Sequence, residues 1–226
     1  MTVKIGEYQI TTILTGELWC QNCYLVKCLA TQELVLLDPG DDAQQIIEHV
    51  HGQRGMLTSI LITHAHHDHV LALEDVAREF QAPCYVHQAD TRLLRQTHTY
   101  ALVFDKRQIK PIKVPCKHFD RSLKIGQRRI RVIDTPGHTP GSVCFDFGDF
   151  IFTGDLVLFQ HVGRSDTPGS DMEQLRASLG SLFEQLQDET AIFPGHGRAW
   201  TVGEARVWWR DAAGVLPEYK RFGGIE

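Results

Sequence analysis

Apolar runs alternate with amphipathic stretches along the chain, and this alternation predicts strands that are followed by helices. Runs rich in aliphatic and aromatic residues predict strands near residues 2–15, 21–29, 33–37, 57–63 and 82–87. Helical spacing of apolar positions predicts helices near residues 41–50, 70–80 and 88–96. Because no linker, repeat or low-complexity tract interrupts the pattern, we expect one α/β domain over residues 1–226.

The second half of the chain continues this pattern after residues 97–122, which show no periodicity and predict no element. We then expect a strand over residues 128–137 and a hairpin over residues 142–155 that turns at Gly148 and Asp149. A last strand over residues 190–197 and a last helix over residues 203–211 follow. Ser170 and Glu173 have the spacing of a capping box and predict the start of another helix. The apolar face of that helix carries Leu175, Leu179, Leu182, Phe183 and Leu186.

Composition and charge narrow the class of protein. The 226 residues are 42% hydrophobic and 23% charged, which is typical of a soluble globular chain. A net charge of −5 gives no reason to expect binding to nucleic acid or to an anionic membrane surface. No apolar run approaches the roughly 20 residues that span a bilayer, and residues 1–14 lack the pattern of a signal peptide. We therefore expect a cytoplasmic protein whose six cysteines stay reduced.

The cysteines include one C-x-x-C pair, Cys20 and Cys23, which follows a tryptophan as in redox-active proteins. Such pairs are activated by the positive end of a helix, whereas this pair leads into a predicted strand. We therefore interpret both residues as structural rather than as a redox or metal site. The other four cysteines are scattered and read as small buried hydrophobic residues: Cys28, Cys84, Cys116 and Cys144.

Candidate chemistry gathers in the stretch THAHHDH, which directly follows a predicted buried strand. His64, His66 and Asp68 are spaced by two, so an extended turn directs all three to one side. Asp68 and His69 stand at the start of the next predicted helix, where the chain changes direction, and His69 can face an adjoining space. The spacing therefore allows two neighbouring metal positions, while His67 points elsewhere.

More ligands are needed, because a catalytic metal usually has three protein ligands and an open position for water. Three candidates follow later strands: His138 in DTPGHTPGS, Asp155 in FIFTGD and His196 in IFPGHG. Each lies beside glycine, which permits close approach of the backbone and a tight loop. Together with the cluster, these residues predict a metal centre at the strand ends.

The motifs THAHHDH, TPGHTPGS, FTGD and PGHG, in this order, resemble the metallo-β-lactamase fold superfamily and within it the short bacterial glyoxalase II-like hydrolases. The resemblance covers nearly the full length. It implies an αβ/βα sandwich of two mixed β-sheets with helices on the outer faces. Asp38 in LLDPG matches an aspartate that supports the ligands in these proteins without binding metal.

The resemblance also implies the metal ligands. The first metal would be bound by His64, His66 and His138, the second by Asp68, His69 and His196, with Asp155 bridging both. The cofactors would be two divalent ions, zinc first, with iron or manganese as alternatives. True β-lactamases of this fold usually have cysteine at the position of Asp155, which argues against a β-lactamase.

The implied reaction is attack of a metal-bound hydroxide on a thioester such as S-lactoylglutathione, or on a related activated ester. Asp68 would orient the nucleophile as well as bind metal. Arg164, in a GRSD segment that matches the short bacterial proteins, is a candidate for binding an anionic substrate group. The alternative for Arg164 is a structural pair with Asp166.

Other functions stay open. The first alternative is a persulfide dioxygenase of the same fold, which would hold one iron through His64, His138 and Asp155. A nuclease or phosphodiesterase is less favoured because the net charge is acidic. A metal-binding sensor without catalytic activity is less favoured because the set of predicted metal ligands is complete. We expect a small-molecule substrate, no nucleic-acid or membrane partner, and a monomer or homodimer.

Overall fold

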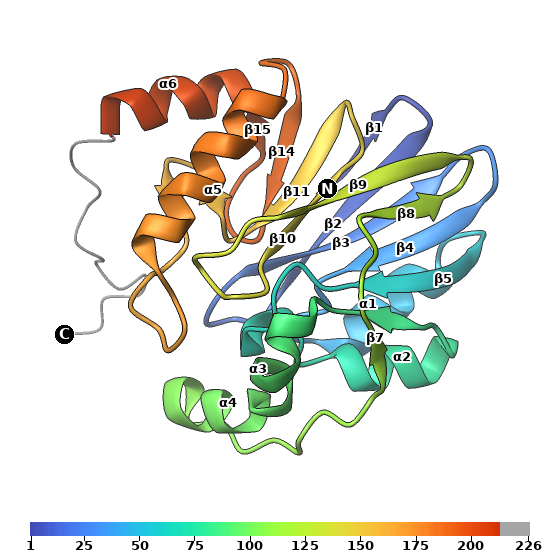
Figure 1. Cartoon of the computed structure of the whole chain (residues 1–226). Coiled ribbons are helices and arrows are strands. Elements are labelled where there is room, and N and C mark those ends of the chain that lie inside the picture. The colour runs from blue at the N-terminus through green and yellow to red at the C-terminus, as the bar shows by residue number, and fades with distance from the viewer. Residues whose placement is uncertain (213–226) are drawn as a thin grey trace.

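The structure, a computed structural model, describes residues 1–212 and consists of two mixed β-sheets that face each other between outer helices (Figure 1). The first sheet has the order β1 (Thr2–Ile5), β2 (Tyr8–Thr15), β3 (Gln21–Cys28), β4 (Glu33–Leu37), β5 (Met56–Leu61), β6 (Cys84–Tyr85) and β7 (Cys116–Lys117). Its strands are antiparallel from β1 to β4 and parallel from β4 to β7. Residues 213–226 of the predicted domain lie outside the described part.

The second sheet follows the first in sequence. Its order is β15 (Trp200–Thr201), β14 (Ala191–Pro194), β11 (Phe150–Gly154), β10 (Val143–Asp146), β9 (Arg128–Asp134) and β8 (Ser122–Ile125). Strands β11 and β14 are parallel, and the other neighbours are antiparallel. A small ribbon pairs β12 (Val157–Leu158) with β13 (His161–Val162).

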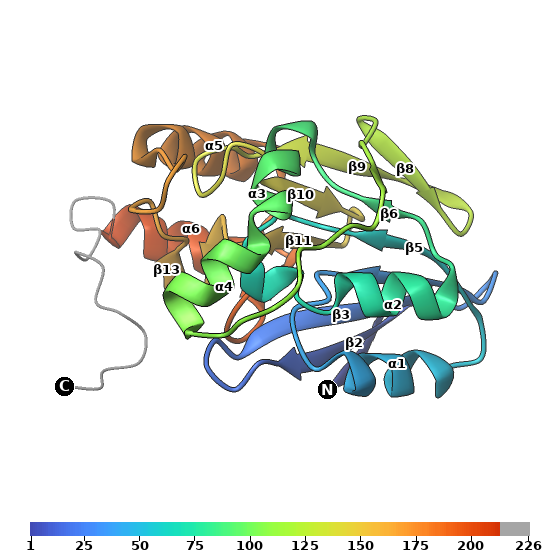
Figure 2. The same cartoon turned by 90° about the horizontal axis from the view of Figure 1, so that it is seen from below.

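Helices cover the outer faces of both sheets (Figures 1 and 2). They are α1 (Ala43–His51), α2 (Leu73–Phe80), α3 (Thr91–Arg95), α4 (Thr97–Asp105), α5 (Met172–Gln185) and α6 (Val202–Ala212), with short 3₁₀ turns η1 (His67–His69) and η2 (Gln88–Asp90). Within residues 1–212, none of them combines the length and the apolar character that crossing a bilayer requires.

Three apolar clusters hold the layers together. An aromatic cluster that includes Tyr8, Phe145 and Phe152 fills the space between the sheets. Ile46 of α1 and Val76 of α2 belong to a second cluster on the outer face of the first sheet, and a third cluster packs α5 and α6 on the second sheet. Burial of these apolar faces is the dominant favourable contribution to folding. The predicted α/β class and αβ/βα sandwich are confirmed.

Two local predictions are corrected by the structure. Helix α5 is capped by Asp171, whose carboxylate accepts the backbone N–H groups of Glu173 and Gln174, rather than by Ser170. The hydroxyl of Ser170 instead donates to the carbonyl of Thr167. Both residue types are good caps, so only the path of the preceding loop decides between them. His69 lies in the separate turn η1 rather than in the helix that follows it.

The expectation that all cysteines stay reduced is wrong for Cys84 and Cys116, which form a disulfide. These residues are direct partners in the neighbouring strands β6 and β7, with Cα atoms 4.8 Å apart. Their sequence separation of 32 crosses the stretch that predicted no element, so their pairing could not be inferred. Cys20 and Cys23 are free thiols, and burial raises the pKa of Cys23 well above its usual value, in line with an inert structural residue.

Candidate metal centre

The predicted metal ligands all follow the ends of strands. His64, His66, Asp68 and His69 come after β5, while the other three predicted ligands follow β9, β11 and β14 and are His138, Asp155 and His196. The carboxyl ends of the parallel strands β11 and β14 meet at one edge, which brings the last two loops together. Gly195 is needed there, since a Cβ atom at this position would lie 2.2 Å from Oδ1 of Asp155.

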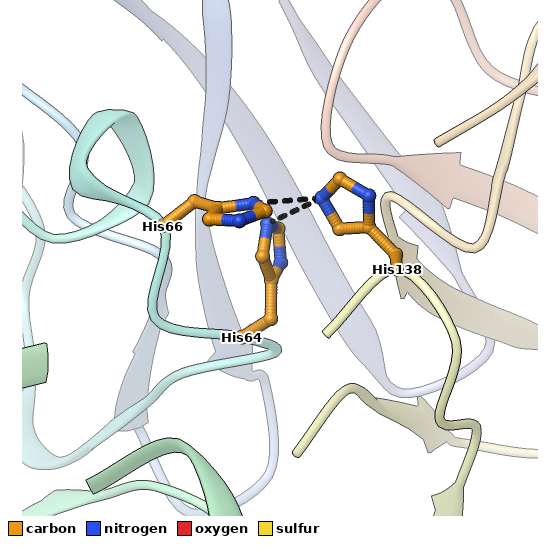
Figure 3. Close-up of side chains that lie close together, drawn as sticks. All are labelled: His64, His66 and His138. Atoms are coloured by element: carbon orange, nitrogen blue, oxygen red, sulfur yellow. Dashed lines mark hydrogen bonds between the residues drawn. The ribbon is translucent and has the colours of Figure 1, made fainter. Parts of the chain in front are cut away.

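The first group contains His64, His66 and His138, whose side chains point toward one another from two separate loops (Figure 3). The Nε2 atom of His138 lies 2.8 Å from Nδ1 of His66 and 3.2 Å from Nε2 of His64. All three side chains are buried. Three imidazoles that converge in this way match a common arrangement of protein ligands to a catalytic metal.

The second group contains Asp68, His69 and His196. The Nε2 atom of His196 lies 3.2 Å from Oδ2 of Asp68 and 3.3 Å from Nε2 of His69. Asp155 stands between the two groups, because its Oδ2 lies 3.5 Å from Nε2 of His138 and its Oδ1 lies 3.5 Å from Nε2 of His69. The position of this carboxylate suits a bridge between two cations.

The hydrogen bonds around the imidazoles show that the two groups are suited to cations. His138 and His196 donate their Nδ1 protons to the carbonyls of Arg164 and Trp19, at 2.7 and 3.0 Å. His69 donates to the carboxylate of Asp38. In the neutral form of each ring, the form that binds a cation, the Nε2 atom then carries a lone pair that faces the centre.

Within each group, the Nε2 atoms of two histidines face one another, at 3.2 Å in the first group and 3.3 Å in the second. His64 completes the first facing pair, because its Nδ1 donates to the hydroxyl oxygen of Thr63, which itself donates to Asp38. In addition, Oδ1 of Asp155 is buried and lacks a hydrogen-bond partner within the described residues. Buried polar atoms normally have partners, so this donor set fits two divalent ions.

The electrostatics of the site favour positive charge at the same place. Burial lowers the pKa of His64 well below its usual value, and the neighbouring His69 lowers it further. Burial alone would raise the pKa of Asp155, but His196 and His69 hold it well below the usual range. Burial disfavours the charged forms of His69 and His196, but Asp155 and Asp68 raise the pKa of both imidazoles above the usual value. Positive charge is therefore favoured beside the ionised carboxylates, and a bound cation would take the place of those protons.

Asp38 supports this centre without facing it. A set of Asp38, His64 and His69 is also compact enough for a cation. The oxygens of Asp38, however, accept the backbone N–H and the hydroxyl of Thr63, at 2.7 and 2.6 Å, as well as Nδ1 of His69. These bonds occupy the carboxylate, which orients His69 as a carboxylate commonly does for a metal-binding histidine.

His67 points away from both groups, as expected from its position between the ligands. Its Nε2 atom lies 3.1 Å from the carboxylate of Asp105 in α4, and its ring stacks on Phe104. The guanidinium of Arg164 pairs with both carboxylate oxygens of Asp166, at 2.8 and 2.9 Å. Arg164 also lines the cavity in front of the metal groups.

Sequence reasoning missed Asp90, a buried aspartate that joins the two halves of the first metal group. It accepts the backbone N–H of Ala65, between His64 and His66, at 2.9 Å. It also accepts the hydroxyl of Thr139 and the backbone N–H of Gly141, both at 2.8 Å, in the loop that carries His138. No motif around Asp90 signalled this role, because all three contacts come from distant segments.

We expect replacement of Asp90 by asparagine to lower the free energy of unfolding by about 2–4 kcal/mol and to weaken metal binding. An amide has one acceptor oxygen for three donors, and its own N–H group would face buried N–H groups. Urea unfolding and metal titration measure the two effects. The control is Asp134→Asn at an exposed position, and equal stability of the two variants would contradict the assigned role.

Comparison with known proteins agrees with this geometry. The family model described as the metallo-beta-lactamase superfamily matches residues 18–196. The probable metallo-hydrolase YqgX of Bacillus subtilis is 29% identical over 184 residues, covering 78% of this chain and 84% of that protein.

Three solved structures are similar over most of their length. BLEG-1, described as a B3 metallo-beta-lactamase, is 31% identical with a TM-score of 0.81, covering 88% of this chain and 96% of that one. TTHA1623, in a di-iron-bound form, is 32% identical with a TM-score of 0.77, covering 87% and 96%. ETHE1 from Myxococcus xanthus is 27% identical with a TM-score of 0.70, covering 91% and 84%. The family model spans most of the chain, and the chain therefore belongs to the metallo-beta-lactamase superfamily.

Proposed function

We propose that the protein is a metal-dependent hydrolase that cleaves a thioester, such as S-lactoylglutathione, or a related activated ester. The observation that carries this proposal is the position of Asp155 between two complete ligand groups. Similarity to a probable metallo-hydrolase supports hydrolysis. The thioester is inferred from the motifs that resemble glyoxalase II-like proteins.

Each metal position has its own set of ligands. His64, His66 and His138 would hold one divalent ion, and the second would be held by Asp68, His69 and His196, with Asp155 shared. Zinc is our first choice, with iron or manganese as alternatives, and TTHA1623 has been solved with two irons. When bound, such ions supply Lewis acidity and lower the pKa of water to about 7.

Residues of the chain orient the reactants. Although burial favours the neutral form of Asp68, His69 and His196 hold the pKa of its carboxyl well below the usual range. An ionised carboxylate accepts a hydrogen bond from the attacking water and so directs the lone pair of that water toward the substrate carbonyl. Asp68 therefore has a catalytic role beside its role as a ligand.

The test is a panel of thioesters, including S-lactoylglutathione, assayed together with the metal content of the same preparation. We expect turnover of at least one thioester by protein that holds two metals per chain, and much less turnover after the metals are removed. If protein with two bound metals hydrolyses none of the thioesters, the proposal is wrong.

A second candidate is a persulfide dioxygenase, because ETHE1 is among the similar structures. It would use one iron on His64, His138 and Asp155, a ligand set that suits oxygen chemistry. The complete second group favours hydrolysis instead. Oxygen uptake with glutathione persulfide at a substantial rate, by protein that holds one iron, would replace the hydrolase proposal.

The similarity to BLEG-1 makes β-lactam hydrolysis worth measuring on the same preparation. The resemblance implies that β-lactamases of this fold usually have cysteine at the position of Asp155, which argues against this activity. A nuclease or phosphodiesterase remains the least supported alternative. The following expectations stay predictions: a small-molecule substrate, no nucleic-acid or membrane partner, a monomeric or homodimeric state, and a cytoplasmic location.

A further inference from the structure

The cavity in front of the two ligand groups exposes mainly apolar surface, and the side chains of Arg164 and Arg198 also line it. It measures about 490 Å³ and reaches from Asp68 and Asp155 outward. Its volume lies within the range of roughly 300–1,000 Å³ that is typical of small-molecule sites. The apolar lining comes from the segment before β3, from α4 and from the ribbon after Asp155, and it includes Leu18, Trp19, Tyr100, Phe104, Leu158 and Phe159.

Three of these residues, Trp19, Tyr100 and Phe104, form what we call the aromatic wall. The rings of Tyr100 and Phe104 are stacked with centroids 6.0 Å apart, and the ring of Phe104 also stacks on His67 at 5.9 Å. The indole of Trp19 meets His67 edge to face at 5.8 Å. His67 precedes Asp68 in the chain, so the aromatic wall begins beside the metal centre.

The aromatic wall is held in place by a buried carboxylate. Asp105, at the end of α4, accepts the indole N–H of Trp19 at 2.9 Å and lies 3.1 Å from Nε2 of His67. The side chain of Asp105 is only 9% exposed. Because hydrogen bonds join three separate segments here, the distance between the aromatic wall and the metal ligands is defined by the fold.

The apolar surface beside this site remains partly open to solvent. Leu18 is 62% exposed and Phe104 is 37% exposed, although neither side chain has a polar group. An apolar ligand that covers them displaces water from both surfaces, which favours binding. The lactoyl group carries a hydroxyl and glutathione is a charged tripeptide, so neither part of S-lactoylglutathione supplies an extended apolar surface to match these side chains.

We propose that the natural substrate carries an extended alkyl or aryl arm, which binds along the aromatic wall while its thioester or ester carbonyl lies at the metal centre. This inference rests on the proposed hydrolase function and narrows its substrate class. The arm belongs either to the acyl group or to the leaving group, and both use the same apolar contacts.

Binding can be measured without turnover, using zinc-loaded protein and straight-chain carboxylates from acetate to octanoate. All members share the carboxylate, so differences in affinity report the arm alone. Isothermal titration calorimetry is expected to show affinity rising roughly threefold per methylene until the cavity is filled. Octanoate that binds no more tightly than acetate would overturn the proposal.

Matched variants on α4 locate the effect. Phe104→Ala removes a ring that lines the cavity and is expected to reduce the octanoate-to-acetate affinity ratio about tenfold. Val103→Ala is the control, because Val103 is exposed on the same helix and does not line the cavity. If both variants keep the ratio of the unmodified protein, the aromatic wall is not the binding surface.

Two substrate series then assign the arm. One lengthens the acyl group of glutathione thioesters, and the other lengthens the alkanethiol of lactoyl thioesters. A rise of kcat/KM with length in either series supports the proposal and identifies the arm, whereas thioesters that are cleaved with no rise in either series overturn it. If no thioester is cleaved while octanoate still binds more tightly than acetate, the hydrolase function fails and the apolar site stands.

Discussion

Asp155→Asn is expected to lower kcat/KM for a hydrolysed substrate by roughly 100- to 1,000-fold, on the scale of losing a group that acts in the transition state. Asparagine has the same shape but lacks the negative charge. The two ligand groups would then hold two cations without the carboxylate that stands 3.5 Å from an imidazole nitrogen of each. We therefore expect metal content to fall from two ions per chain to one or fewer.

Elemental analysis and steady-state kinetics of the same preparation measure both effects. The matched control is Asp149→Asn, which makes the same chemical change in the turn between β10 and β11, where the side chain is 63% exposed. The control is expected to keep full activity and two metals. An Asp155→Asn enzyme with two ions and normal activity would show that Asp155 is not a bridging ligand.

Removal of the metals is expected to reduce activity to below about 1% and to lower the melting temperature by about 10 °C. Ligands that bind only the folded state stabilise it by about 4 kcal/mol at a thousand times their dissociation constant. For a chain of this size each kcal/mol corresponds to about 2–4 °C. Without cations, the Nε2 atoms of His64 and His138 face one another at 3.2 Å, and the buried Oδ1 of Asp155 has no hydrogen-bond partner among the described residues.

The measurement is thermal unfolding and activity before and after treatment with a strong chelator, followed by return of zinc, manganese or ferrous iron separately. The control is the same chelator saturated with zinc beforehand. Restoration of both stability and hydrolysis by one ion identifies the metal that suits the site. Metal-free protein with unchanged melting temperature and activity would exclude a metal-dependent reaction at this centre.

The layered fold and the clustering of the candidate ligands were predictable because their signals are local. A buried strand followed by alternating histidines predicts that His64 and His66 leave the strand toward one side, and the structure places them together. Glycines beside His138 and His196 indicated tight loops at strand ends. The start of α5 was misplaced by one residue, since Ser170 and Asp171 are both suitable caps and only the turn geometry selects Asp171.

The contacts between distant segments were not predictable. Asp90 lies 25 residues from Ala65 and 51 from Gly141, and its hydrogen bonds to them leave no pattern in the chain. The disulfide between Cys84 and Cys116 depends on the pairing of two very short strands. Helix α4, which supplies Phe104 and Asp105, falls in the stretch without periodicity.

By itself, therefore, the sequence predicted the residues of the candidate metal centre, because residue type and spacing at a strand end are local properties of the chain. The tertiary structure decided how those ligands divide, placing Asp155 between the two groups. It also decided what surrounds them. The aromatic wall joins Trp19 to α4 across 86 residues, through a hydrogen bond that exists only when both segments are packed together.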